Sequence, residues 1–135
     1  MTQWQAGMRI TAARLNNFAP VVLTESVVLA TGWALTSFSA RRAAGTVEWT
    51  VILTRSGDAL AAAGSSGNIG DVLTCTLPAS CRPGARYITQ FDKGGVASGS
   101  VRIETSGTCT LTSMDPTSAI AQNDSVTFSG TVAAG

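Results

Sequence analysis

The chain has 135 residues, of which 44% are hydrophobic and only 13% are charged, and its formal net charge is +1. The charged fraction is about half of the roughly 25% that is usual in globular domains, so much of the surface must be small and uncharged or be covered by another subunit. So small a net charge excludes a broad basic field for nucleic acid or for an anionic membrane.

Several functional classes are also disfavoured by what the sequence lacks. No apolar stretch approaches the ~20 residues of a membrane span, and no apolar run follows Arg9 and Arg14, so we expect no secretory signal. Histidine is absent, and Lys93 is the single lysine. The commonest general base and zinc ligand are therefore missing. We expect no catalytic residue, no metal site and no cofactor, and an enzyme is the least favoured class.

Residues 1–20 differ from the rest of the chain and predict a short helix. Thr11 is a suitable N-cap, while Ile10 and Leu15 have the spacing of a hydrophobic staple, and Pro20 ends the helix. A helix of about two turns falls short of the ~12–15 residues needed for independent stability, so it must dock on something. We expect an N-terminal attachment arm that contacts a partner through Trp4, Ile10, Leu15 and Phe18.

From residue 21 onward, short alternating runs predict β-strands. Residues 21–30 form one such run. Residues 33–42 and 46–55 are separated by a short glycine-containing loop and predict a hairpin. In the second of these strands one face carries Val47, Trp49, Val51 and Leu53, which is the period-two pattern of a half-buried strand.

The remaining segments complete an all-β pattern. Residues 56–70 are small and glycine-rich and predict a loop. Further strands are predicted at 71–78, 85–91, 96–105, 108–114 and 124–132. About eight short strands with frequent turns favour one domain, residues 21–135, with the fold of an antiparallel β-sandwich of the jelly-roll type.

The three cysteines, Cys75, Cys81 and Cys109, give an odd number, which argues against a disulfide framework. Buried reduced thiols are the favoured interpretation. A bridge between Cys75 and Cys81 across a turn remains the alternative.

One motif of the body resembles a known family. Leu77-Pro78 followed by Arg82-Pro83 resembles the "LPxGYRP" element in head domains of bacteriophage tail-fibre and virion-surface proteins. The segment "GSVRIETSGTCTL" is similar to the strands that follow this element, and "DSVTFSGTV" stands in the place of the last strand. The chain departs from the family at Ser80 and Cys81, where Gly-Tyr is usual, so no role that needs this tyrosine is assigned.

The opening segment resembles the start of many actinobacterial phage structural proteins, through the pattern W-x-x-G-x-x-I-T-A-x-x-L-N from Trp4 to Asn16. Together the two resemblances cover most of the chain and imply a phage virion protein assembled in the host cytoplasm. The expected partners are a phage capsid or tail protein and further copies of the chain, since its low charge and apolar faces favour a homotrimer. The expected role is capsid decoration and stabilisation, or that of a head fibre.

A second functional class stays open, that of a tail-fibre or baseplate protein that binds a glycan on the host surface. In that case the loops at 56–70 and 92–97 would face the host. The candidate ligand-facing residues are Asp58, Asn68, Asp92 and Lys93. The alternative for the carboxylates in these loops is that they are solvated turn formers, because no run of acidic residues with calcium-binding spacing exists.

Overall fold

The computed structural model describes residues 19–134, so the predicted helix and the predicted attachment residues Trp4, Ile10, Leu15 and Phe18 lie outside the described residues. The described chain is all-β, as predicted, with one 3-10 turn at Ala79–Cys81. No helix in this part of the chain is long and apolar enough to cross a membrane. The strands are β1 (Val21–Leu23), β2 (Val28–Leu29), β3 (Trp33–Ala43), β4 (Thr46–Arg55), β5 (Asn68–Thr76), β6 (Tyr87–Lys93), β7 (Ala97–Ile103), β8 (Thr108–Met114) and β9 (Ser125–Ala133).

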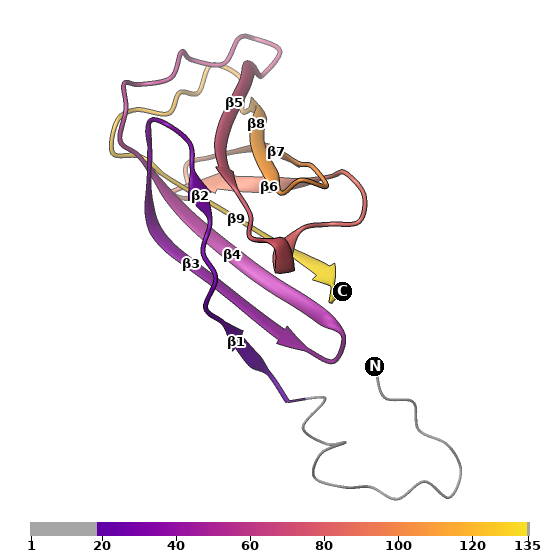
Figure 1. The fold of residues 1–135 in the computed structure, drawn as a ribbon. Helices are drawn as coiled ribbons and strands as arrows, with labels where there is room; N and C mark the ends of the chain where they lie inside the picture. Colours follow the sequence, from indigo (N-terminus) through magenta and orange to yellow (C-terminus); the bar gives the residue numbers. More distant parts are fainter. Residues whose placement is uncertain (1–18, 135) are drawn as a thin grey trace, which may run out of the picture.

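The nine strands form one antiparallel sheet in the order β1-β3-β4-β9-β6-β7-β8-β5-β2, which curls into a half-barrel (Figure 1). The strands β6, β7 and β8 follow one another through short turns, and β5, which precedes them in the chain, lies beside β8. This arrangement is a Greek key, since the long connection from β5 to β6 returns the chain to the far side of the meander.

The predicted jelly-roll sandwich of two sheets is not what the structure shows. β6 pairs with β9 at Phe91↔Phe128 and Asp92↔Thr127, and this short ladder joins the group β1-β3-β4-β9 to the group β6-β7-β8-β5-β2. The two groups are therefore halves of one sheet. A period-two pattern determines which face of a strand is buried, but it does not determine which strand edges pair, and so the sequence could not reveal this joint.

The segment predicted as a single strand at residues 21–30 is divided between the two edges of the sheet. β1 pairs with the C-terminal part of β3, whereas β2 pairs with the C-terminal part of β5. Residues 24–27 cross the opening of the half-barrel between these edges (Figure 1). Both sheet edges are consequently covered over only a few residues.

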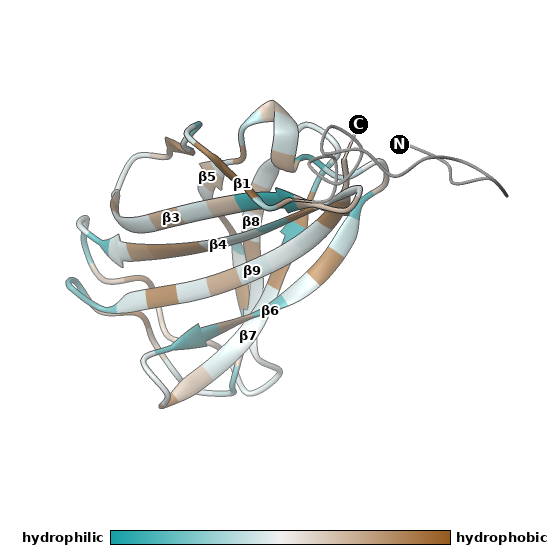
Figure 2. Ribbon diagram, turned by 90° about the horizontal axis from the view of Figure 1, so that it is seen from below, coloured by the Kyte–Doolittle hydropathy of each residue, from teal (hydrophilic) through white to brown (hydrophobic). Residues whose placement is uncertain are grey.

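The core lies on the inner face of the half-barrel, where the predicted alternation is confirmed. Val47, Trp49, Val51 and Leu53 of β4 are all at most 2% exposed, and apolar residues alternate with polar ones along the neighbouring strands (Figure 2). Trp49 meets Phe128 of β9 edge to face, with ring centroids 6.0 Å apart. Such aromatic pairs contribute about 0.5–1.5 kcal/mol beyond the area that they bury.

The two ends of the half-barrel differ. The longer loops, residues 56–67 and 115–124, lie at one end and hydrogen-bond to each other through Leu60 N–H to the Ile120 carbonyl and Ala63 N–H to the Ser118 carbonyl. The opposite end holds β1, the β3–β4 turn and the last residues of β9, where Ala134 N–H donates to the Gly45 carbonyl at 2.8 Å. Residues 1–20 therefore join the domain at the end away from the loops.

Candidate functional site

Two of the predicted ligand-facing residues stabilise turns. The side-chain oxygen of Asn68 accepts the Gly70 N–H at 2.9 Å, and a carboxylate oxygen of Asp92 accepts the Gly95 N–H at 2.9 Å. Both side chains are exposed. Their positions in the sheet also place them beside a groove, which is described below.

Lys93, another predicted ligand-facing residue, is engaged inside the protein. It is only 17% exposed, and its ammonium group donates to the Ala119 carbonyl at 2.7 Å and lies 3.3 Å from a carboxylate oxygen of Asp124. The backbone N–H of Ala121, followed by Lys93, holds the pKa of Asp124 below its usual value. Asp58 is exposed in the loop after β4, where its carbonyl accepts from the Arg55 guanidinium.

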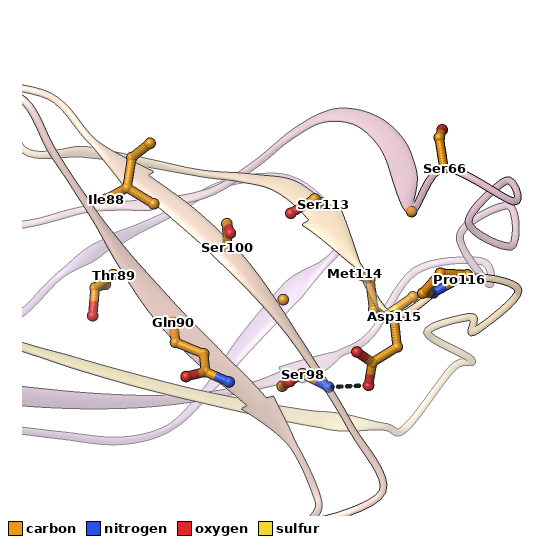
Figure 3. A pocket seen from close by; sticks show the side chains of 12 residues that line it. Ser66, Ile88, Thr89, Gln90, Ser98, Ser100, Ser113, Met114, Asp115 and Pro116 are labelled. Carbon is orange, nitrogen blue, oxygen red and sulfur yellow. Dashed lines mark hydrogen bonds between the residues drawn. The ribbon is translucent and has the colours of Figure 1, made fainter.

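An open groove of about 460 Å³ runs over β6, β7 and β8 toward the loop end (Figure 3). Cross-strand pairing produces a polar row in it, because Gln90 lies opposite Ser100, Ser100 opposite Ser113, and Ser113 opposite Asn68. Residues directly opposite each other on neighbouring strands share one face of the sheet. The groove is lined by Ser66, Gly67, Ile88, Thr89, Gln90, Ser98, Gly99, Ser100, Ser113, Met114, Asp115 and Pro116.

The central strand of the groove, β7, lines it with small residues. A Cβ atom added to Gly99 would overlap the Ser113 carbonyl and stand 2.6 Å from the Phe91 ring, so that only glycine fits there. At one end, a carboxylate oxygen of Asp115 accepts the Ser98 N–H at 3.0 Å (Figure 3). Asp92 lies opposite Ser98 on the next strand, so two carboxylates border this end.

The groove offers hydrogen-bonding groups to a ligand. Hydroxyl groups, one amide and one carboxylate can exchange hydrogen bonds with a polar ligand. The lining contains neither cysteine nor lysine, and histidine is absent from the chain. Within residues 19–134, no group of three or more potential metal ligands is found.

A second surface, which we name the apolar edge, consists of exposed aliphatic residues around the opening of the half-barrel. Val22 and Val28 are 75% and 70% exposed. Six of the eight exposed large hydrophobic residues in the described chain come from β1, β2, β3 and β5, and a concentration of this kind marks a contact site more often than scattered residues do. The apolar edge comprises Val21, Val22, Val28, Leu29, Leu35 and Leu73.

The apolar edge also contains strand backbone without a sheet partner. β1 covers β3 only at residues 40–42, which leaves the outer side of residues 33–39 unpaired among the described residues. Natural edge strands are commonly protected by charged residues or proline. Residues 21–40 contain a single charge, that of Glu25, so this edge is unprotected against pairing with another strand.

The cysteines are buried and reduced, as the sequence favoured. Their arrangement differs from the pair that the sequence suggested. Cys75 of β5 lies directly opposite Cys109 of β8, while Cys81 belongs to the 3-10 turn. Burial raises the pKa of the Cys81 thiol.

The groove serines and the apolar edge are the functional candidates that sequence reasoning missed. Ser98 and Ser100 alternate with Gly99 and Val101, a signal that does place both serines on one face. Their alignment with Ser113 depends on strand register, which the sequence does not contain.

In comparisons with known proteins, the chain matches no protein-family model, and no curated protein is similar to it in sequence.

Proposed function

We propose that this protein is a structural protein of a bacteriophage particle. In this proposal a homotrimer of β-domains is held to the particle by residues 1–20 and faces outward as a capsid-decoration or head-fibre protein. The two sequence resemblances support the class of protein. The observation that carries the proposal is the apolar edge, because six exposed aliphatic side chains and a strand edge without a partner among the described residues favour contact with another protein.

The positions of the two surfaces agree with such a role. The first described strand, β1, lies at the end of the half-barrel opposite the loops (Figure 1). Attachment at that end leaves the loops and the groove directed away from the particle. Contact between copies through the apolar edge buries the unpaired backbone of β3, and a closed ring of three leaves no copy with an uncovered edge.

The mass of the protein in solution and its place on the particle test this proposal. Light scattering is expected to give three times 13.8 kDa, or about 41 kDa. Labelling of particles with an antibody against the domain is expected to mark the capsid. A stable monomer at micromolar concentration contradicts the trimer, and label confined to the tail contradicts decoration.

The groove favours the second candidate, a receptor-binding protein that contacts a glycan on the host surface. Its row of hydroxyl and amide groups, Gln90, Ser100, Ser113 and Asn68, matches the hydrogen-bonding groups of a sugar. If this candidate is correct, the antibody marks the tail tip and Ser100→Trp, which fills the groove, abolishes adsorption to host cells. Ser106→Trp, in the exposed β7–β8 turn, is the matched control that keeps adsorption.

A further inference from the structure

Two of the three thiols occupy a position that a disulfide requires. Cys75 and Cys109 are Cα partners in the antiparallel ladder of β5 and β8, and both side chains are buried, at 1% and 0% exposure. Directly opposed residues in such a ladder have Cα atoms about 4.5–5.5 Å apart, within the 4.4–6.8 Å span of disulfides. Their Cβ atoms, typically about 4.5–5.5 Å apart, need to approach by roughly 1 Å.

The surroundings of the pair favour reaction at Cys75. A hydrogen bond from Cys109 lowers the pKa of the Cys75 thiol, while the same contact raises the pKa of Cys109. Thiolate is the reacting species in disulfide exchange, so Cys75 is the first nucleophile. The Thr74 hydroxyl, which donates to the Cys109 carbonyl at 2.9 Å, also lies 3.9 Å from the Cys75 sulfur.

Access of a small reagent to Cys75 requires a local opening at the edge of the sheet, because the Cys75 side chain is only 1% exposed. β2 is the neighbour of β5 on its outer side. It pairs through Val28↔Thr76 and Leu29↔Cys75, and the Ala30 N–H extends this contact by donating to the Thr74 carbonyl at 2.9 Å. A two-residue strand with exposed side chains opens at low cost in free energy. Such an opening uncovers the backbone around Cys75 while β8 stays in place on the other side of β5.

We propose that Cys75 and Cys109 form an intramolecular disulfide when the protein meets a low-molecular-weight disulfide, which joins edge strand β5 covalently to β8. The Cys75 thiolate attacks one sulfur of the reagent, the reagent's S–S bond breaks, and one small thiol leaves. The Cys109 thiolate then attacks the Cys75 sulfur and expels the second small thiol. The protein loses two electrons and the reagent gains them, and the two protein protons end on the two released thiols.

This inference stands apart from the proposed function, because it depends only on β5, β8 and their thiols. The bridge would enclose the 33 residues between the two cysteines and so restrict the unfolded chain. We expect the oxidised protein to melt about 10 °C above the reduced protein.

The test is incubation of the folded wild-type protein with oxidised glutathione, followed by mass spectrometry without reduction. We expect a mass loss of about 2 Da for the two thiol hydrogens. Trypsin does not cut between Arg82 and Pro83, so a Cys75–Cys109 bridge links the tryptic fragments 56–86 and 103–135, whereas a Cys75–Cys81 bridge lies inside the first fragment.

Three single variants separate the possible pairs. Cys81→Ala, the matched control with an equally buried thiol, is expected to keep the link between the fragments, while Cys75→Ala and Cys109→Ala lose it. The wild-type fragment map excludes a Cys75–Cys81 bridge, and a link that persists in Cys81→Ala excludes a Cys81–Cys109 bridge, so these two measurements identify the pair even if Cys75→Ala or Cys109→Ala does not fold. Three free thiols after oxidation, glutathione that stays attached to Cys75, or a link that disappears in Cys81→Ala would each overturn the proposal.

Discussion

At the scale of single residues, Gly130 of β9 is in close contact with two aromatic side chains of the core. Gly130 lies opposite Trp49 in the sheet, and a Cβ atom added to it would stand 2.7 Å from the Trp49 ring and would overlap the Tyr87 hydroxyl. That hydroxyl is buried and has no hydrogen-bond partner among the described residues, and burial raises the pKa of Tyr87 to about 12. Glycine is therefore needed here for space, because it lets two aromatic rings rest on the strand backbone.

Gly130→Ala is expected to destabilise the protein by about 1–3 kcal/mol, since the added methyl group forces the Trp49 or Tyr87 ring to move. The measurement is the urea midpoint of unfolding, followed by tryptophan fluorescence. Gly84→Ala is the control, because no atom lies within 4 Å of a Cβ added there. An equal loss in both variants would show that the contacts of Gly130 with Trp49 and Tyr87 do not explain the effect.

At the scale of elements, the loop before β9 is held against β6 by one partly buried ion pair. Lys93, at the end of β6, bonds to the carbonyl of Ala119 within this loop and to Asp124 at its end. Ile120, which lies between Ala119 and Asp124 in the sequence, is fully buried. The predicted ligand-facing lysine thus positions the loop that closes this end of the half-barrel.

Asp124→Asn is expected to lower stability by about 1 kcal/mol at pH 7, because it leaves the Lys93 ammonium group without its counter-charge. The folded-state pKa of Asp124 is lowered, so its stabilisation is present in full above the unfolded pKa of about 3.9 and is lost as the pH falls through the folded pKa. The difference between wild type and variant should therefore shrink below about pH 4.

Asp92→Asn is the matched control for this experiment, since Asp92 also accepts a backbone N–H in a turn but has no ion pair among the described contacts. Urea titrations at several pH values measure both variants. A difference that stays constant from pH 7 to pH 3 would rule out the charge as its cause.

At the scale of the whole molecule, the half-barrel has two edges that, among residues 19–134, only β1 and β2 cover. The exposed valines of these two short strands lie where a second copy would complete the sheet in the proposed trimer. Aspartate at these positions brings charge to the contact and protects the edge, as charged residues do in natural edge strands.

The double variant Val22→Asp with Val28→Asp is expected to reduce the mass measured by light scattering from about 41 kDa, three times 13.8 kDa, to that of one chain. Val96→Asp is the control. Val96 is 78% exposed in the β6–β7 turn, away from the apolar edge, so its substitution should leave the trimer intact. Unchanged mass in the double variant would remove the apolar edge from the proposal.

Much of the secondary structure could be predicted from local patterns. The hairpin predicted for residues 33–42 and 46–55 is present, and the strands predicted at 96–105 and 108–114 pair with each other. Val101, Ile103, Val126 and Phe128 are buried, as the alternation of apolar and polar residues in their strands requires. The candidate site was less predictable. Of the four proposed ligand-facing residues, Asn68 and Asp92 border the groove, Lys93 stabilises a loop, and Asp58 lies elsewhere in an exposed loop.

By itself the sequence determined the class of fold, the strands and their buried faces, because these depend on neighbours one or two residues away. Tertiary structure decided everything that depends on pairing between distant strands. The joint at Phe91 and Phe128 makes one sheet where two were predicted, and the ladder of β5 and β8 sets Cys109, rather than Cys81, against Cys75. The polar row of the groove likewise exists only once four strands are in register, and register depends on burial and backbone pairing across the whole domain.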